Sequence, residues 1–347
     1  NKFVHLHTHS HYSLLDGLGK IDNIVNRTKE LGMDSIALTD HGNLYGAIEF
    51  YKKAKKAGIK PILGIEAYVA PTDHKLKQSN GEEKYFHLIL LAKNNAGWKN
   101  LIQLVTLAHL DGFYYKPRID KNLLRRYSEG LIGLSACITG EVAKSILNHK
   151  PAEAEKTALE YQEILGKGNF YIEIGHHPGI KEVTAANKGL IELSRKTGIP
   201  LAATHDLHYV KKEDAEYHDI LLAVQTGNTI FDKNRLTLKD DDFSLRSPDE
   251  MAEFFRDVPE AVENTVKIAE QCNVTIELGK THLPKFDVPD GKSAEQFMEE
   301  LVMQRASNRY PEITEEVKVR IAYELGVVNK TGFADYFLIV QDFVNWA

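Results

Sequence analysis

The stretch HLHTHSHYSLLDG near the start of the sequence carries a dense group of side chains that can bind metal ions. Histidines stand at every second position from His5 to His11, and Asp16 follows them. Alternate residues of an extended segment point to the same face. His7 and His9 can therefore converge on one ion, and by spacing alone His5 or His11 could join them. The pattern predicts a metal clamp.

A second pair with the same spacing, Asp206 and His208, stands in THDLHY. Further residues of ligand type each follow or end a segment that we expect to be a strand: His41, Glu66, His87 and Cys137. Imidazoles, carboxylates and a possible thiolate suit Zn²⁺, Mn²⁺ or Fe²⁺ better than Mg²⁺ or Ca²⁺. These donors are too many for one ion, so two or three ions bridged by a carboxylate are expected. Clustered ions suit phosphoester hydrolysis, because they bind phosphoryl oxygens, supply a bound hydroxide and stabilise the leaving oxygen.

Strand-like and helix-like segments alternate over the first two hundred residues. The predicted strands cover 3–10, 34–40, 59–70, 85–93, 131–137, 170–175 and 200–210, and the predicted helices cover 21–32, 43–58, 96–109, 141–149, 152–165 and 182–198. This alternation predicts a parallel sheet with helical crossovers, and the number of units favours a closed βα-barrel over an open sheet. Active sites of such barrels lie where the carboxyl ends of the strands meet. We therefore expect the ligand-type residues to share one mouth.

The pattern changes after about residue 231. We expect a short strand and then a capped helix that begins near Ser247, followed by a linker rich in proline and glycine at 281–293. Three helices are predicted beyond it, at 295–310, 315–332 and 334–347. The last one is strongly apolar and stops abruptly, so we expect a chain cut from a longer polypeptide.

The composition limits the classes of protein to consider. The chain has 347 residues, and no apolar run approaches the roughly 20 residues of a membrane span. Two cysteines predict a reducing cytoplasm and no disulfide framework. A formal net charge of −6 does not indicate a domain that grips duplex DNA on its own.

Several motifs resemble the PHP (polymerase and histidinol phosphatase) domain of bacterial DNA polymerase III alpha subunits. They are HTHSHYSLLDG, ALTDHGNLYGAIEFYKKAKKAGIKPILGIEAYVA, YFHLILLAKN, GFYYKPRID, GLIGLSAC and ATHDLHYV. The resemblance implies a distorted seven-stranded βα-barrel with up to three metal ions, over residues 1–283. GFADYFLIVQDFV resembles the opening of the polymerase palm, so residues 284–347 are expected to be its mainly helical start. The glycine-rich and triple-aspartate elements of that family's polymerase site are absent from the sequence.

The resemblance also implies a ligand set, which is His7, His9, Asp16, His41, Glu66, His87, Cys137, Asp206 and His208. Glu66 is expected to bridge two ions. Cys137 matches a position filled by histidine in some relatives, and His5 stands where related phosphoesterases often have aspartate. None of the ligands is lost here, which favours a metal-dependent 3′→5′ exonuclease that proofreads beside the polymerase site.

The same resemblance implies partners. They are the primer 3′ end of DNA in the context of the full polymerase, the sliding clamp, and a separate proofreading exonuclease, with Mg²⁺ serving polymerisation in the full-length protein. Two alternatives stay open at this point. One is a phosphomonoesterase of histidinol-phosphatase type, and the other is a barrel whose ions only stabilise a scaffold for the polymerase.

Four further residues are candidates for supporting roles. Asp40 is expected to orient His41 by a hydrogen bond. His177 ends a predicted strand and is a candidate for substrate contact. Arg118 and Tyr114 stand in the aromatic and basic segment GFYYKPRID, which could approach a DNA end or simply pack.

Overall fold

The computed structural model describes residues 2–77, 84–239, 241–280 and 282–347. The chain forms two compact units, Asn1–Thr275 and Ile276–Ala347. The functional division at 283/284 stays a prediction. No helix among the described residues has the length and apolar character needed to cross a lipid bilayer.

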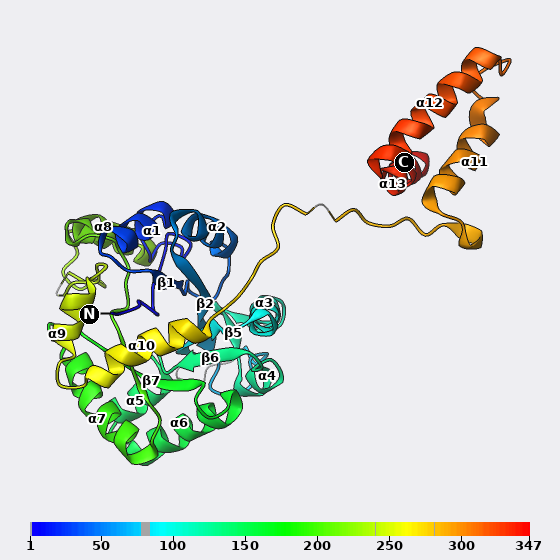
Figure 1. Cartoon of the computed structure of the whole chain (residues 1–347). Coiled ribbons are helices and arrows are strands. Elements are labelled where there is room, and N and C mark those ends of the chain that lie inside the picture. The colour runs from blue at the N-terminus through cyan, green and yellow to red at the C-terminus, as the bar shows by residue number, and fades with distance from the viewer. Residues whose placement is uncertain (1, 78–83, 240, 281) are drawn as a thin grey trace. The chain divides into compact units, whose positions relative to one another are not determined.

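The first unit is built on one curled sheet surrounded by helices (Figure 1). Its main strands, in spatial order, are β1 (Ser35–Leu38), β2 (Lys60–Val69), β3 (Phe86–Ala92), β6 (Leu131–Leu134), β7 (Phe170–Gly175) and β8 (Leu201–Thr204). The small hairpin of β4 (Phe113–Tyr114) and β5 (Lys116–Ile119) pairs with the end of β2.

The sheet is mixed, so the expected all-parallel arrangement is wrong. β3 runs antiparallel to both β2 and β6, while the β1–β2, β6–β7 and β7–β8 pairs are parallel. Parallel neighbours need a crossover of a dozen or more residues, usually a helix. The described residues between β2 and β3 contain no helix, and the chain turns back instead.

The N-terminal segment completes the barrel. It is extended but forms only an isolated bridge, Thr8 to Leu207, where a full strand over 3–10 was predicted. Its backbone nevertheless forms hydrogen bonds with β1 on one side and with the segment just beyond β8 on the other. Ala37 N donates to His5 O at 2.8 Å beside β1, and His9 N donates to Leu207 O at 2.8 Å just beyond β8. The segment thus serves as the seventh strand of a distorted βα-barrel, as the sequence predicts.

Helices cover the outside of the barrel because each presents an apolar stripe to the sheet. In α1 (Ile21–Glu30) the buried side chains are Ile21, Ile24, Val25 and Thr28, which follow helical spacing. The other helices are α2 (Ala47–Ala57), α3 (Asn95–Leu110), α4 (Lys121–Arg126), α5 (Glu141–Leu147), α6 (Pro151–Leu165), α7 (Lys181–Thr197), α8 (Ala215–Thr226), α9 (Pro248–Phe254) and α10 (Pro259–Gln271). Short 3₁₀ helices cover Lys212–Asp214 and Pro289–Gly291.

The predicted helix start at Ser247 is confirmed. Ser247 Oγ accepts from Glu250 N, and Glu250 Oε2 accepts from Ser247 N at 2.8 Å, which is a capping box. The short strand expected just before it does not form within residues 241–247. The sequence analysis also missed the β4–β5 hairpin and the helices α4, α8 and α10.

One end of the barrel is filled with apolar side chains, which leaves the other end for chemistry. The core cluster includes Leu6, Ile62, Ile89, Leu134 and Ala202. Helix α10 packs on the same cluster through Ile268 and Ala269, and Cys272, the residue after the helix, joins them. Burying each of the larger side chains stabilises the fold by about 1.5–3 kcal/mol. This packing fixes the strands that carry the polar residues.

The second unit is helical, as expected. It contains α11 (Ala294–Ala306), α12 (Glu315–Thr331) and α13 (Ala334–Trp346), and a small core of Ala294, Met298, Ala334 and Leu338. Capping side chains begin two of these helices, Ser293 for α11 and Thr314 for α12.

Candidate metal centre

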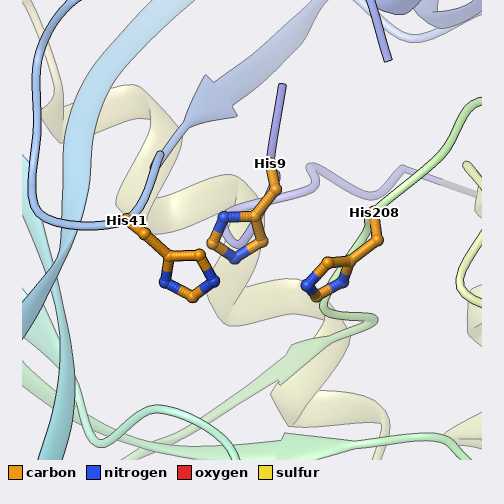
Figure 2. Close-up of side chains that lie close together, drawn as sticks. All are labelled: His9, His41 and His208. Atoms are coloured by element: carbon orange, nitrogen blue, oxygen red, sulfur yellow. The ribbon is translucent and has the colours of Figure 1, made fainter. Parts of the chain in front are cut away.

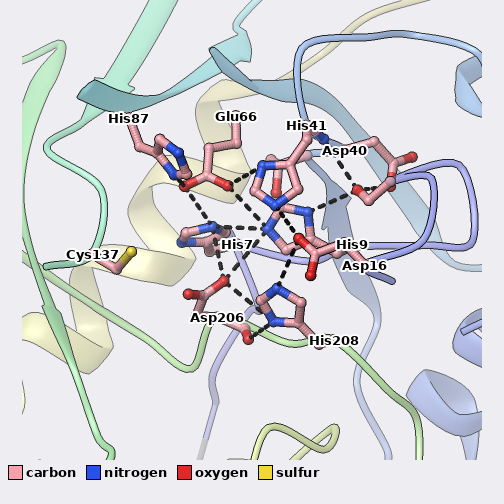
Figure 3. Close-up of polar contacts among 12 residues, drawn as sticks. His7, His9, Asp16, Asp40, His41, Glu66, His87, Cys137, Asp206 and His208 are labelled. Carbon is pink, nitrogen blue, oxygen red and sulfur yellow. Dashed lines mark hydrogen bonds and ion pairs between the residues drawn. The ribbon is translucent and has the colours of Figure 1, made fainter. Parts of the chain in front are cut away.

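Histidine and carboxylate side chains from five separate segments converge at one end of the barrel (Figure 3). The contributing segments are the N-terminal stretch, the turn after β1, β2, the start of β3 and the turn after β8. His87 was expected near the end of its strand, but it is the second residue of β3. It reaches the centre because β3 is antiparallel, so that its beginning meets the end of β2, with Tyr68 opposite His87.

The first group, with four donors, contains His7, His9, Glu66 and Asp206. The Nε2 atoms of His7 and His9 are 3.1 Å apart. His7 Nε2 lies 3.3 Å from Glu66 Oε1 and 3.1 Å from Asp206 Oδ1. His9 Nε2 lies 3.2 Å from Glu66 Oε2 and 3.4 Å from Asp206 Oδ1. Four donors from three segments therefore face one point.

Glu66 links this group to a second one. Its Oε1 lies 2.8 Å from His87 Nδ1, and its Oε2 lies 2.8 Å from His41 Nδ1. The same carboxylate thus contacts four imidazoles, those of His7, His9, His41 and His87. It is placed as a bridging ligand would be.

A third group surrounds Asp16. Its Oδ2 lies 2.7 Å from His41 Nε2 and 3.7 Å from His208 Nε2. The rings of His41 and His208 each stack against His9, with centroids 4.2 and 4.6 Å from it and 6.3 Å from each other (Figure 2). His41 therefore lies between the second and third groups, with one nitrogen toward each.

Asp206 and His208 face the centre for a reason other than strand alternation. β8 ends at Thr204, and Asp206 has a φ of +42°, in the left-handed region that side chains other than glycine rarely adopt. Ala136, beside Cys137, has a φ of +62°. Such strained residues persist where the surrounding structure over-determines them, often at functional sites.

The charges of the cluster stabilise one another. Burial alone raises the pKa of the Glu66 carboxyl, but the nearby His87, His7 and His41 outweigh it and hold that pKa well below its usual range. Burial lowers the pKa of His41, yet Glu66 and Asp16 raise it overall to about 10. Hydrogen bonds with His208 and His41 likewise hold the pKa of Asp16 well below its usual range, against the effect of burial. The carboxylates of Glu66 and Asp16 are therefore stabilised by positive charge at the centre.

Two protein families match this chain. The PHP domain family matches residues 5–177, and the family described as bacterial DNA polymerase III alpha NTPase domain matches residues 296–347. Over its whole length the chain is 47% identical to the DNA polymerase III subunit alpha of Borreliella burgdorferi and 38% identical to that of Thermus aquaticus. The chain belongs to the bacterial DNA polymerase III alpha family. It spans about a third of these relatives, 30% and 33% of their lengths.

Solved structures show more distant likenesses. An amidohydrolase from Chromobacterium violaceum aligns with 60% of this chain and 88% of its own, at 14% identity and a TM-score of 0.41. A two-domain protein from Bacteroides vulgatus, which contains a predicted PHP-like metal-dependent phosphoesterase, aligns with 81% of this chain and 72% of its own, at 17% identity and a TM-score of 0.37.

The donor atoms of the PHP barrel fit divalent ions. Ligand atoms about 2.0–2.2 Å from a tetrahedral ion lie roughly 3.3–3.6 Å from one another. The contacts of the first group, 3.1–3.4 Å, are close to that spacing. Asp206 Oδ1 and His41 Nδ1 are buried and near charged partners, but neither makes a hydrogen bond of acceptable geometry within the described part of the chain. Atoms that approach without bonding in this way fit a shared ion between them.

Glu173 and Ser13 support the histidines, and the sequence analysis missed both. Glu173 Oε1 lies 2.8 Å from His7 Nδ1 and accepts from Thr204 Oγ1 at 2.7 Å. Ser13 Oγ lies 2.9 Å from His9 Nδ1. The signal for Glu173 was a lone acid inside the apolar strand FYIEIG, because a buried carboxylate needs a partner.

Asp40 supports the loop of the metal clamp. Its Oδ1 accepts from Ser10 N at 2.7 Å and from Ser13 Oγ at 2.8 Å. These serine contacts, rather than a bond to the His41 ring, are the hydrogen bonds that the structure describes for the Asp40 carboxylate. It acts on His9 through Ser13, and His41 N donates to the same Ser13 Oγ at 3.1 Å.

Cys137 lies beside the centre (Figure 3) but outside the groups of converging donors found among the described residues. Its Sγ is 3.2 Å from Thr139 Oγ1. Burial, followed by the negative charges of Asp206 and Glu66, raises the pKa of this thiol.

His177, Arg118 and Tyr114 do not join the converging donors. His177 is buried and stacks on His205 and Phe243, with ring centroids 4.8 and 4.1 Å apart. Arg118 is 3% exposed and donates to backbone carbonyls, so the packing role fits it. Tyr114 lies against Arg118, with its ring centroid 5.0 Å from the guanidinium carbon.

The remaining two histidines of the clamp sequence are neighbours. His5 Nε2 lies 2.9 Å from Arg246 O. Burial lowers the pKa of His5 to about 4, so its ring is neutral and donates to that carbonyl. His11 packs on Tyr12 with ring centroids 4.2 Å apart.

Proposed function

We propose that this chain is the N-terminal part of a DNA polymerase III alpha subunit whose PHP barrel hydrolyses the terminal phosphodiester of a DNA 3′ end. The supporting observation is the position of Glu66, whose carboxylate contacts four imidazoles and joins two groups of ligand-type side chains. A shared carboxylate can hold two ions close together, as hydrolysis of a phosphodiester by clustered ions needs. The relatives' name, DNA polymerase III subunit alpha, supports DNA as the substrate.

Each group has a distinct part in the proposal. His7, His9, Glu66 and Asp206 hold one ion. Glu66 and His87 hold a second, with Cys137 as a further candidate ligand, and Asp16 and His208 hold a third. His41 serves the second or the third, because a neutral imidazole offers one nitrogen lone pair.

Bound divalent ions supply an acidified water and neutralise charge on the phosphoryl oxygens. The protein's own residues position that chemistry. Glu173 holds the His7 ring by its Nδ1, and Ser13 holds the His9 ring by its Nδ1. The opposite nitrogens of both rings are thereby turned toward Glu66 and Asp206. Because imidazoles and carboxylates dominate, Zn²⁺, Mn²⁺ or Fe²⁺ are the proposed ions.

Polymerisation, with Mg²⁺, and contacts with a sliding clamp or a separate exonuclease belong to the whole polymerase in this proposal. The sequence contains PHP and early palm segments, without the glycine-rich and triple-aspartate elements of nucleotidyl transfer. The assignment of residues 1–283 to the PHP domain and of 284–347 to the palm is part of the same proposal.

The test is metal content by elemental analysis, combined with release of single nucleotides from a primer with a mismatched 3′ end. The native chain and Asp206→Ala are compared, with Asp257→Ala, an exposed carboxylate, as the matched control. We expect two or three ions in the native chain and in the control, and release that Asp206→Ala abolishes.

Other results would lead to different conclusions. A chain without ions would refute the proposed centre. Bound ions without release would favour a scaffold stabilised by metal. Hydrolysis of a phosphomonoester far faster than that of a DNA 3′ end would favour the phosphatase.

A further inference from the structure

The β4–β5 hairpin carries an exposed aromatic residue and pairs with the end of β2, the strand that holds Glu66. Tyr115 is the connecting residue of the hairpin and is 65% exposed. Its φ is +60°, so a bulky side chain occupies a left-handed position that favours glycine. Strain of this kind is a starting point for a functional hypothesis.

Contacts of Lys116 and Tyr68 connect the hairpin to the ligand-type histidines. The ring of Tyr68, buried in β2, has its centroid 5.8 Å from that of His41 and 5.2 Å from that of His87. Lys116 Nζ lies 5.5 Å from the Tyr68 ring centroid. The residue before Lys116 is Tyr115, so the hairpin extends directly from the side of the centre formed by His41 and His87.

Two lysines, Lys84 and Lys116, bring positive charge to the aromatic rings of this hairpin and of β2. Lys84 Nζ lies 3.8 Å from the centroid of the Tyr115 ring, and Lys116 lies over Tyr68. Within the described part of the chain, each makes a cation–π contact and no ion pair with a carboxylate. In a chain of net charge −6, these ammonium groups beside a phosphoesterase centre are suited to bind phosphate.

We propose that Tyr115, Lys84 and Lys116 bind the 3′-terminal segment of single-stranded DNA and direct it to the metal centre. This inference rests on the proposed function and extends it to the residues that hold the substrate. The Tyr115 ring stacks on a base, and the two ammonium groups pair with backbone phosphates. Single-strand binding sites combine exposed aromatic rings with positive charge in this way.

The hairpin is held firmly enough to act as a platform. Arg118, in β5, donates from Nη2 to His74 O at 2.9 Å and to Leu76 O at 2.7 Å. The guanidinium lies against the Tyr114 ring, and Tyr114 packs edge-on against Tyr115 with centroids 4.6 Å apart. A fixed ring loses little conformational freedom when a base stacks on it.

The decisive variant is Tyr115→Gly, because it removes the ring while relieving the left-handed strain. We expect its melting temperature to be equal to or above that of the native chain. Its affinity for a single-stranded oligonucleotide with a phosphorothioate 3′ end, measured by fluorescence anisotropy, should fall by about tenfold or more. Tyr217→Ala, which removes an equally exposed ring on α8 (64%), is the matched control and should bind like the native chain.

The lysines are tested by salt dependence. The double variant Lys84→Ala/Lys116→Ala should lower the slope of log affinity against log salt by about 1.4, the contribution of two phosphate contacts on a single strand. Lys99→Ala/Lys188→Ala, which removes two exposed lysines elsewhere, should leave the slope unchanged.

Three outcomes would overturn the inference. The first is a native chain that does not bind the oligonucleotide. The second is a Tyr115→Gly variant that binds as tightly as Tyr217→Ala. The third is an equal slope of log affinity against log salt for Lys84→Ala/Lys116→Ala and Lys99→Ala/Lys188→Ala. Failure of the proposed hydrolysis is distinguishable, because binding is measured on an end that resists cleavage. A native chain that binds through Tyr115 but releases no nucleotide from a normal end would refute the nuclease and uphold the binding surface.

Discussion

Nδ1 of His7 lies 2.8 Å from Oε1 of Glu173, and this contact orients the ring whose other nitrogen faces the metal centre. Both side chains are buried, and Glu173 is fixed in turn by Thr204. A carboxylate behind a ligating imidazole sets its tautomer and raises its basicity. Glu173 is therefore a positioning residue of the proposed site.

Replacing Glu173 by glutamine should weaken metal binding without removing a ligand. The amide oxygen can still accept from His7, but the negative charge that raises ligand basicity is lost. We expect affinity for the tightest ion to fall by about 10–100-fold, measured by competition with a fluorescent chelator. Glu182→Gln, at an exposed position of α7, is the control. Equal affinities in the two variants would show that Glu173 only fills space.

Glu66→Gln should have the largest effect on metal content of any single substitution of a carboxylate. Because this carboxylate contacts four imidazoles, its loss affects two groups of donors, whereas Asp206→Asn affects one. We expect elemental analysis after dialysis to find at least one ion fewer per chain in Glu66→Gln than in Asp206→Asn. Glu30→Gln, at an exposed position of α1, should keep the native content. A Glu66→Gln variant with full metal content would exclude a bridging role.

The sequence indicated the converging residues well because ligand chemistry is local. His7 with His9, and Asp206 with His208, are recognisable by type and spacing, and the barrel brings them together. Local sequence patterns did not reveal the direction of β3, because that direction depends on how the chain turns back after β2. His87 therefore lies at the centre through the beginning of its strand, where the sequence analysis expected the end.

Supporting residues were harder to predict, because their roles depend on contacts between distant segments. Glu173 is 166 positions from His7, and only burial of its carboxylate reveals its role. Asp40 was assigned to His41, its neighbour in sequence, whereas it anchors Ser10 and Ser13 of the clamp loop. The left-handed turn at Asp206 was equally hidden, since no glycine marks it.

Metal binding should release protons at neutral pH. Glu66 and Asp16 raise the pKa of His41 to about 10, so this ring is charged in the metal-free chain at pH 8. The stabilisation from this charge is fully present below the ordinary pKa of about 6.5 and is lost as pH rises through about 10. An ion needs the neutral ring, so loading must displace that proton, and apparent affinity must rise with pH.

The measurement is proton release in weakly buffered solution, followed with an indicator dye while ions are added. At pH 8 we expect the native chain to release at least one proton more than His41→Asn does. His149→Asn, at an exposed position, should behave like the native chain. Equal release from the native chain and His41→Asn would show that His41 is neutral before the ion binds.

Replacing Arg118 in the β4–β5 hairpin should show whether this residue stabilises the fold or binds DNA. Its guanidinium is buried and donates to the carbonyls of Gly112, His74 and Leu76, and a lysine cannot satisfy all three. We expect Arg118→Lys to lower the free energy of unfolding by about 2–3 kcal/mol, measured by urea denaturation, because buried acceptors lose their donors. Arg126→Lys, at an exposed position of α4, should change it by less than about 0.5 kcal/mol. If Arg118→Lys instead kept native stability and lost affinity for single-stranded DNA, Arg118 itself would be a DNA ligand, as the basic segment GFYYKPRID first suggested.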